Sequence, residues 1–328
     1  MDTSVAPVIK VDLDSPQAFA RKTVIVTGAS SGIGLEIAEF FYDLGCNVVF
    51  VGGRNRPDTY VGLDSSRALA CQCDISSWDS QTEAFEAAIK KFGHIDVVCL
   101  NAGVAEPRGQ FFDLKVDHTG RPLAPDLRVL DVDLKGTLYG VALGFYYLRD
   151  TGGTVIMVTS RAGYGGNEIM PAYSAAKNGA TGLLRSLAGS AKEKGIALTI
   201  VAPHITFTPG VFLQQYKRGK EAFDQMRAKL QAVGVNLSSS RTCAIACAYL
   251  VQGGLEMSGV GLLVEDDEIY NLEQSINDNL PAWFKVKGDT RAARDEYAKQ
   301  MERDQANAHG DRHRAKPEWA KSHSDRNM

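Results

Sequence analysis

The sequence predicts a single doubly wound α/β domain built on a mostly parallel, seven-stranded sheet. Between residues 20 and 265, short apolar runs typical of buried strands alternate with longer segments whose apolar residues recur at helical spacing. Glycine-rich or polar residues directly follow several of these runs, at the sheet edge where ligands bind in open α/β folds. The 328 residues therefore divide into an N-terminal arm (1–18), the α/β domain (19–269) and a charged C-terminal extension (270–328), partly helical or disordered.

A glycine-rich turn follows the first predicted strand, Thr23–Val26, and leads into a helix predicted from Ile33 to Leu44. Glycines in such a turn let the backbone bend tightly and approach a ligand, and the helix start aims unpaired N–H groups at that ligand. We therefore expect a phosphate cradle for a dinucleotide, although a plain tight turn would show the same pattern. The residues of the predicted cradle are Gly28, Ser30, Ser31, Gly32, Ile33 and Gly34.

The second predicted strand, residues 47–51, completes a βαβ unit, and its end bears on the choice of cofactor. An acid about 20 residues past such a turn binds the adenosine ribose of NAD. Counting from Gly34, this position is Arg54, and the segment 52–56 contains no acid. A guanidinium pairs well with phosphate, so Arg54 favours the 2′-phosphate of NADP, with NAD as the second choice. The alternative is that Arg54 is a solvated loop residue.

Two more predicted strands, residues 68–73 and 95–100, end in residues suited to contact the cofactor. After the first, the Asp74 carboxylate can accept a hydrogen bond from an adenine amino group or cap the helix predicted over 79–91. After the second, small residues let a cofactor lie close to the backbone. The residues concerned are Asp74 and Ile75, then Asn101, Ala102 and Gly103.

The chemistry is expected at two later elements. A strand over 153–159 delivers Ser160 at its carboxyl end, and a helix predicted from Tyr173 to Lys194 carries Tyr173 and Lys177 one turn apart on one face. An ammonium beside a phenol favours the phenolate, so we expect Lys177 to lower the pKa of Tyr173 toward working pH. Tyr173 then serves as acid/base, and Ser160 hydrogen-bonds the same substrate oxygen.

With these residues in this order, the sequence resembles the classical short-chain dehydrogenase/reductase family over roughly residues 20–265, which implies a Rossmann-like fold. In that family the matched Tyr is the proton donor or acceptor, the Lys lowers its pKa and contacts the nicotinamide ribose, and the Ser orients the carbonyl or hydroxyl. The resemblance also implies a homodimer or homotetramer through the helices near 126–150 and 172–194. The matching residues are the segment 27–34, Asp74-Ile75, Asn101-Ala102-Gly103, Ser160, Tyr173, Lys177 and Thr208. Thr208 corresponds to a carboxamide contact in the family, with a plain loop hydroxyl as the alternative.

Two positions depart from the family pattern. Asp133 stands where the family has an Asn that completes a proton relay, and an ionised carboxylate cannot donate a hydrogen bond. We therefore expect the relay to be altered or to be compensated by Lys135, and count Asp133 as a candidate catalytic residue. His204 replaces the Gly of a Pro-Gly turn, and we expect it to have a steric or structural role rather than a catalytic one.

The remaining segments bear on substrate choice and on the chain end. The irregular loop 104–125 and the lid-like stretch 209–235 both contain aromatic residues and are expected to line a pocket for a sizeable apolar substrate. The last predicted strand is 260–264, and the acidic run after it is expected to be a solvated turn. In the polar extension we expect one helix, over 290–306.

The composition limits partners and location. A formal net charge of −3, from 36 Lys+Arg and 39 Asp+Glu, offers no basic field for nucleic acid or an anionic membrane, so a small molecule is the expected partner. We find neither a leader peptide nor the roughly 18 apolar residues of a membrane span, and expect a cytoplasmic protein. The six cysteines contain no Cys-x-x-Cys pair, so we expect buried reduced thiols and no metal site.

Together these observations predict an NADP(H)-dependent oxidoreductase that interconverts a ketone and a secondary alcohol on a moderately large, apolar small molecule, with secondary-metabolite biosynthesis as one setting. Two alternatives stay open. One is the same reaction with NAD(H) in the oxidative direction. The other is a non-redox cofactor-binding protein on the same scaffold, acting as a regulator or as an isomerase or cyclase.

Overall fold

An eight-stranded sheet forms the centre of the fold, with the strand order β3-β2-β1-β4-β5-β6-β7-β8. The computed structural model describes residues 7–13, 16–53, 63–212, 216–279, 296–297 and 299–301. Neighbouring strands are parallel from β3 to β7, and β8 alone pairs antiparallel, with β7. The strands are β1 (Thr23–Thr27), β2 (Asn47–Gly52), β3 (Ala68–Gln72), β4 (Val97–Leu100), β5 (Gly153–Val158), β6 (Ile196–Pro203), β7 (Gly261–Glu265) and β8 (Glu268–Asn271).

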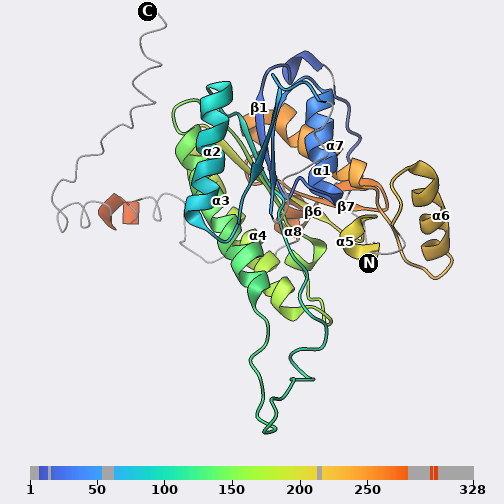
Figure 1. Ribbon diagram of the computed structural model, residues 1–328. Helices are drawn as coiled ribbons and strands as arrows, with labels where there is room; N and C mark the ends of the chain where they lie inside the picture. The colour runs from blue at the N-terminus through green and yellow to red at the C-terminus, as the bar shows by residue number, and fades with distance from the viewer. Residues whose placement is uncertain are drawn as a thin grey trace, which may run out of the picture. The chain divides into compact units, whose positions relative to one another are not determined.

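Helices cover both faces of the sheet, as the doubly wound prediction requires (Figure 1). On one side lie α1 (Gly32–Asp43) and α7 (Ser240–Gly253), which pack against each other; α2, α3 and α4 lie on the other. The bounds of these last helices are α2 (Trp78–Phe92), α3 (Gly136–Leu148) and α4 (Pro171–Glu193). The predicted single α/β domain is thus confirmed, with eight strands rather than seven.

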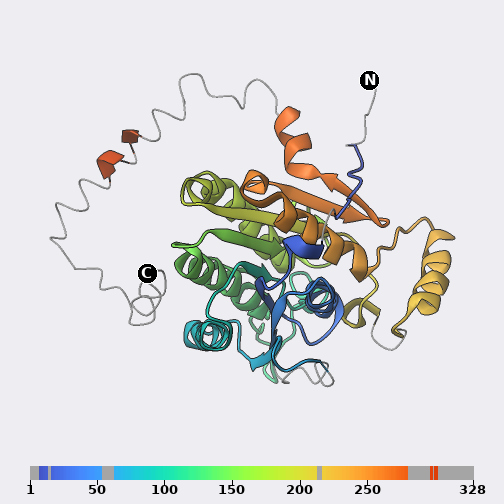
Figure 2. The same cartoon turned by 90° about the horizontal axis from the view of Figure 1, so that it is seen from above.

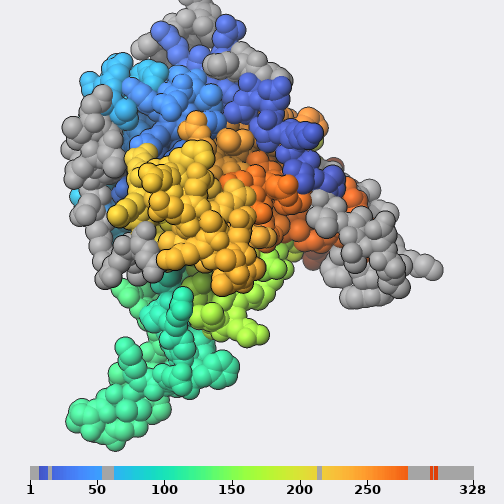
Figure 3. Space-filling model, turned by 90° about the vertical axis from the view of Figure 1, so that its right-hand side faces the viewer, coloured from blue at the N-terminus to red at the C-terminus, as the bar shows by residue number. Residues whose placement is uncertain are grey.

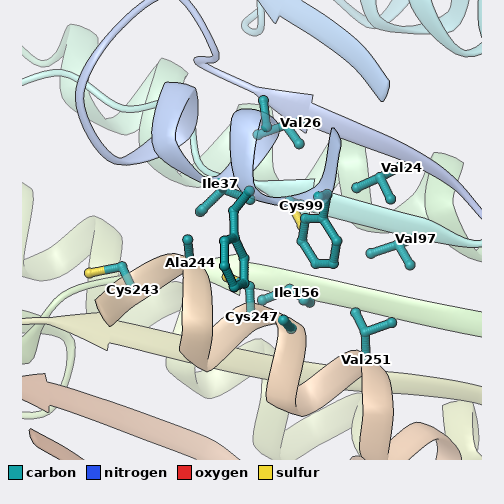
Figure 4. Packing of buried hydrophobic residues seen from close by; sticks show 14 of the residues in the cluster. Val24, Val26, Ile37, Val97, Cys99, Ile156, Cys243, Ala244, Cys247 and Val251 are labelled. Carbon is teal, nitrogen blue, oxygen red and sulfur yellow. The ribbon is translucent and has the colours of Figure 1, made fainter. Parts of the chain in front are cut away.

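The hydrophobic core beneath α1 and α7 explains why the apolar runs are strands and the periodic segments are helices. Strand residues that alternate in direction meet helix residues spaced three or four apart, and all of them are removed from solvent (Figure 4). The labelled members are Val24 and Val26 of β1, Val97 and Cys99 of β4, Ile156 of β5, Ile37 of α1, and Cys243, Ala244, Cys247 and Val251 of α7.

The eighth strand was missed because its signal is short and begins with an acid. β7 and β8 form a hairpin in which Glu265 pairs with Glu268, leaving a two-residue turn. Both turn residues, Asp266 and Asp267, have positive φ values of 52° and 62°, as a tight hairpin turn requires. The predicted turn is therefore present, but it is not merely solvated, because Asp266 and Asp267 both pair with Arg227. The chain returns to the sheet after it.

The chain before β1 also contributes to this edge of the sheet. Val8 forms an antiparallel bridge with Tyr270, and the Ile9 N–H donates to the Ile269 carbonyl at 2.7 Å. Ile9 and two later apolar side chains, Val11 and Leu13, pack against the core. Figure 2 shows this segment running beside the β7–β8 hairpin. Residues 7–13 are thus attached to the domain, where the sequence suggested a loose arm.

The switch in strand order lies at β1, which is flanked by β2 on one side and β4 on the other. Because β1 to β7 are parallel, their carboxyl ends meet at one edge, and the crevice at such a switch point is where ligands bind. Two segments lie near this edge beyond the helical layers. They are the projecting loop 104–128 (Figure 3) and the segment 205–239, which holds α5 (Pro209–Phe212) and α6 (Lys220–Gln231).

Contacts divide the chain into two units, Met1–Asp278 and Asn279–Met328. The first unit ends with α8 (Leu272–Asp278), whose buried Glu273 pairs with Arg185 of α4 at 3.0 Å. Residues 270–278, which the sequence analysis grouped with the extension, therefore pack on the domain. Of the predicted helix 290–306, the structure describes residues 296–297 and 299–301, which are helical. Among the described helices, none has the length and apolar character needed to cross a membrane.

Candidate active site

The predicted catalytic residues lie at the carboxyl end of β5 and the start of α4. Ser160 follows β5 and opens a short helical turn, η4 (Arg161–Gly163), where its Oγ accepts from the Ala162 N–H at 3.1 Å. That turn is held against α4, because the Asn178 side chain donates to the Ala162 carbonyl at 2.8 Å. On α4, the Lys177 Nζ lies 5.4 Å from the centre of the Tyr173 ring. The one-turn spacing predicted for Tyr173 and Lys177 is therefore present.

Asp133 reaches Lys177 from a neighbouring helix. Its Oδ2 lies 3.0 Å from Lys177 Nζ, and the two side chains are 0% and 5% exposed. Its Oδ1 accepts from the Val104 N–H at 2.8 Å, and Lys177 Nζ also donates to the Val158 carbonyl at 3.4 Å. Asp133 lies in a π-helical turn, η3 (Leu130–Lys135), that precedes α3. The position where the family pattern has an Asn thus forms a buried ion pair with Lys177, the candidate catalytic lysine.

Lys135 does not compensate for this change. Its Nζ lies 2.6 Å from Asp131 Oδ1, and this pair is exposed. The alternative in which Lys135 serves the altered relay is therefore wrong, because its ammonium pairs with a different carboxylate on the protein surface.

Burial and pairing act in opposite directions on the two buried charges. Burial raises the pKa of Asp133, and the Lys177 ammonium and the Val104 N–H oppose this shift. Burial lowers the pKa of Lys177, but the Asp133 carboxylate and the Tyr173 phenol outweigh it, so the pKa of Lys177 is raised overall. Asp133 therefore keeps Lys177 protonated inside the protein.

The glycine-rich turn between β1 and α1 has the geometry of an anion cradle. Gly28 and Gly32 have φ values of 69° and 60°, which favour glycine. Ser31 begins α1 without a side-chain cap, so the first N–H groups of the helix are left for a ligand. The Oγ of Ser30 is buried and has no hydrogen-bond partner in the described part of the chain. Ile33 packs partly against the core. The cradle residues therefore fit a phosphate group.

The turn after β4 packs directly onto this cradle. The Thr27 Oγ1 accepts from the Asn101 and Ala102 N–H groups at 2.9 and 3.0 Å, and the Asn101 side chain donates to the Thr27 carbonyl at 3.0 Å. A Cβ on Gly103 would lie 2.7 Å from Asp133 Oδ2. The Asn101–Gly103 turn thus connects the cradle to the buried ion pair. Thr27, which had no assigned role, is the residue that binds the two loops together.

Asp74 lies exposed past the end of β3. Its Oδ1 accepts from the N–H and hydroxyl of Ser76 at 2.9 and 2.7 Å, and these bonds lower the pKa of the carboxyl. Helix α2 is capped by Ser77, so the alternative in which Asp74 caps that helix is wrong. Ile75 packs against Gly136 at the start of α3, where a Cβ would lie 2.3 Å from its side chain.

Thr208 and His204 follow β6 on the opposite side of the crevice. Thr208 is buried and faces the start of α1, where a Cβ on Gly32 would lie 3.4 Å from Thr208 Cβ. The Nδ1 of His204 lies 3.0 Å from Oε1 of Glu265 in β7. Burial lowers the pKa of His204, the Glu265 carboxylate opposes this shift, and Arg161 adds to it. The Glu265 contact agrees with the structural role expected for His204.

One predicted site residue is not described by the structure, and one contacting residue was not predicted. Arg54 lies outside the described residues, in the gap 54–62. Glu106 carried no sequence signal, yet it is 5% exposed and its Oε2 accepts from the Tyr173 N–H. A glutamate in an irregular loop is usually solvated, so only the path of the loop reveals this contact.

The pocket of about 560 Å³ between α1, α6 and the start of α7 lies beside the cradle. It shares Gly32 with the cradle, and its wall includes Phe207, Tyr216 and Phe223. None of Ser160, Tyr173 and Lys177 lines it. The aromatic side chains also pack together, with ring centres 5.0 Å apart for Phe207 and Tyr216 and 6.0 Å for Phe207 and Phe223.

A parallel sheet with a glycine cradle at its switch point, and a Ser, Tyr and Lys at the same edge, defines a dinucleotide-binding oxidoreductase scaffold. The chain belongs to the short-chain dehydrogenase family, whose model matches residues 22–218, and it is a short-chain dehydrogenase/reductase.

Similar proteins cover most of the chain. It is 34% identical over 272 residues to the short-chain dehydrogenase/reductase ascJ of Acremonium egyptiacum, covering 81% of this chain and 84% of that protein. It is 29% identical over 282 residues to the short-chain dehydrogenase/reductase prx4 of Penicillium rubens, covering 80% of each. Among solved structures, 3-ketoacyl-(acyl-carrier-protein) reductase from Brucella melitensis, complexed with NADH, aligns with a TM-score of 0.60 at 23% identity. That alignment covers 76% of this chain and 98% of that one, and shows the shared fold.

Proposed function

We propose that this protein is an NADP(H)-dependent oxidoreductase that interconverts a ketone and a secondary alcohol on a moderately large, apolar small molecule. The observation that carries the proposal is the buried Lys177, held protonated by Asp133 and lying 5.4 Å from the ring centre of Tyr173. A positive charge beside a phenol stabilises the phenolate, which makes Tyr173 suited to exchange a proton with a substrate oxygen.

The cradle and the neighbouring strand ends support binding of a nicotinamide dinucleotide. The N–H groups at the start of α1 and the unpartnered Ser30 hydroxyl would hold its pyrophosphate. The other predicted contacts would hold the rest of the molecule: Asp74 and Ile75 the adenine, Asn101, Ala102 and Gly103 the middle, Tyr173 and Lys177 the nicotinamide ribose, and Thr208 the carboxamide. When bound, the nicotinamide supplies or accepts the hydride.

Two side chains of the protein would transfer the proton and bind the substrate oxygen, and a third would hold the neighbouring lysine in place. The Tyr173 hydroxyl gives its proton to the substrate oxygen in reduction and takes it back in oxidation. The Ser160 hydroxyl donates a second hydrogen bond to the same oxygen, where negative charge develops. Asp133 holds the Lys177 ammonium in place, and is a catalytic candidate only through that lysine.

Replacing Tyr173 by Phe tests the acid/base assignment. Turnover of a ketone with NADPH is expected to fall by at least about 100-fold, with the affinity for the cofactor within about twofold of the parent. Tyr297→Phe, at an exposed tyrosine outside the α/β domain, is the matched control. Retained turnover in Tyr173→Phe would refute the proposed mechanism.

The proposed preference for NADP rests on Arg54, which stands 20 residues past Gly34, where NAD-binding proteins have an acid. Titration with NADPH and NADH, followed by nicotinamide fluorescence, should show tighter NADPH binding, and Arg54→Ala should remove the difference. Arg56→Ala, two residues along the same segment, controls for loss of one positive charge. Tighter NADH binding would favour the NAD-dependent oxidative reaction. Binding of neither would refute a nicotinamide-dependent reaction and leave only a role without redox chemistry.

Substrate class, assembly and location complete the proposal. The exposed Phe111 and Phe112 of the loop 104–128 support an apolar substrate, tested with a ketone library that includes secondary-metabolite intermediates. Exposed apolar side chains on α3, Leu138 and Tyr146, support a homodimer or homotetramer through α3 and α4, tested by light scattering.

The absence of disulfides among the six cysteines supports a cytoplasmic location, tested by cell fractionation.

A further inference from the structure

The catalytic helix begins without a local cap. Met170 occupies the cap position and makes no side-chain hydrogen bond to the helix, and Pro171, the first helical residue, has no N–H. The N–H groups of the first turn of a helix have no partner within the helix. Tyr173 is the third residue of α4, so the N–H of the proposed acid/base residue needs a partner from elsewhere in the fold.

Glu106 supplies that partner. Its Oε2 accepts a short hydrogen bond from the Tyr173 N–H, although the two residues are 67 positions apart in the sequence. Its side chain is buried, and a carboxylate rarely enters the interior unless it is hydrogen-bonded. A negative charge at the amino end of a helix also interacts favourably with the helix dipole.

The other oxygen of Glu106 faces the base of the projecting loop 104–128. Its Oε1 lies 3.4 Å from the Gln110 Nε2. The Gln110 side chain closes the loop base through two bonds to the Asp126 backbone, accepting from the N–H at 2.7 Å and donating to the carbonyl at 3.1 Å. A continuous set of hydrogen bonds therefore runs from both arms of the loop to the backbone of Tyr173.

The start of the same loop also meets the partner of Lys177. The Val104 N–H donates to Asp133 Oδ1 at 2.8 Å, and Asp133 Oδ2 pairs with Lys177. Two residues of the loop, separated by one position, thus contact the two halves of the Tyr173–Lys177 pair.

We infer that Glu106 is a positioning residue. It holds the first turn of α4 so that Tyr173 is correctly placed, and it makes that placement depend on the order of the loop 104–128. The kinetic part of this inference rests on the proposed role of Tyr173 as acid/base. The structural part, a tertiary cap on α4, stands independently of that role.

Amide hydrogen exchange tests the cap directly, with residue-level resolution at Tyr173. In Glu106→Ala, exchange of the Tyr173 amide is expected to be at least about tenfold faster than in the parent, because the N–H loses its acceptor. Glu106→Gln keeps an acceptor oxygen and should show a smaller change. Glu168→Gln, an exposed glutamate just before α4, is the matched control and should not change exchange at Tyr173.

Turnover supplies the second readout. In Glu106→Ala, kcat is expected to fall by roughly 10- to 100-fold with cofactor affinity within about twofold of the parent, since a small displacement of the catalytic group is costly. Glu106→Gln should restore most of kcat.

Parent-like exchange at Tyr173 in both Glu106 variants would overturn the cap, and parent-like kcat in Glu106→Ala would overturn the positioning role. If Glu106→Ala does not fold, amide exchange in Glu106→Gln and Gln110→Ala tests the inference instead. Faster exchange at Tyr173 in Glu106→Gln and across residues 104–128 in Gln110→Ala would support the inference. Unchanged exchange in both variants would refute it. Retained turnover in Tyr173→Phe would instead refute the proposed function, leaving the exchange result to judge the cap.

Discussion

At the scale of the residue, the proposed chemistry of this protein depends on charges placed where water is excluded. Lys177 and Asp133 each lose the hydration they would have at the surface, and their contact at 3.0 Å offsets part of that cost. The carboxylate has a second task, because it also accepts from the Val104 N–H. Removing it would leave the buried Lys177 ammonium and the Val104 N–H without these partners.

Asp133→Ala is therefore expected to lower the free energy of unfolding by about 3–5 kcal/mol, as measured by chemical denaturation at neutral pH. Asp133→Asn should cost less, because the amide oxygen still accepts from Val104. The double variant Asp133→Ala/Lys177→Met should recover part of the loss, since it removes the unpaired charge. A loss below about 1 kcal/mol in Asp133→Ala would contradict a structural ion pair.

Cys46 gives a residue-scale prediction on pH. Its thiol is buried and donates to the Phe19 carbonyl at 3.2 Å, and burial raises its pKa from 9.0 to about 12. Because the folded thiol keeps its proton while the unfolded one ionises, its contribution to stability is full below pH 9. That contribution is lost as pH rises toward 12.

Denaturation at pH 8 and pH 10 checks this sign. The parent should lose about 1 kcal/mol more of its unfolding free energy over this interval than Cys46→Ala. If the unfolding free energy of the parent and of Cys46→Ala depends on pH in the same way, folding does not raise the pKa of the Cys46 thiol.

At the scale of the element, the strand-to-helix turn after β1 packs tightly against the turn after β4. A Cβ on Gly34 would lie 2.3 Å from the Asn101 Nδ2 and 2.4 Å from the Gly28 carbonyl oxygen. Both atoms belong to turns held together by Thr27, so neither can move without opening the cradle. The glycine is required here by close approach and not by its own φ.

Gly34→Ala is expected to lower the free energy of unfolding by about 1–3 kcal/mol and to weaken cofactor binding, because the added methyl group would push the two turns apart. Gly182→Ala, in the middle of α4 with open space around its Cα, is the matched control. It should stabilise by about 0.5–1 kcal/mol, since alanine is the better helix former. Denaturation curves and NADPH titration compare the unfolding free energy and the cofactor affinity of the two variants. Equal values for both variants would show that the turn at Gly34 tolerates a methyl group.

At the scale of the whole molecule, the two ends of the chain differ in their relation to the domain. Residues 7–13 pair with β8 and pack on the core, and the Gln252 side chain donates to the Asp12 carbonyl at 3.1 Å. Residues 279–328 belong to a separate unit. The fold of residues 16–278 should therefore depend on the first segment and not on the last.

Deleting residues 1–13 is expected to lower the free energy of unfolding by at least about 2 kcal/mol, because several apolar side chains lose their burial. Deleting residues 279–328 should change it by less than about 0.5 kcal/mol. Thermal and urea denaturation of the two truncated proteins give the comparison. A larger loss from the C-terminal deletion would show that the second unit stabilises the first.

The sequence by itself determined the alternation of strands and helices, the glycine turn and the one-turn spacing of Tyr173 and Lys177. These are local properties, set by helix and strand periodicity and by the conformational freedom of glycine. The structure confirms these local predictions, because each of them depends on a stretch of at most about two dozen residues.

Only the tertiary structure decided which distant groups meet. The pairing of Asp133 with Lys177, the cap of Glu106 on Tyr173, the clamp of Thr27 on the turn after β4, and the return of β8 and residues 8–9 to the sheet all join segments far apart in the chain. No periodicity encodes such contacts. They follow from the order of the strands and the paths of the loops, which bring buried charges and backbone N–H groups together where each needs a partner.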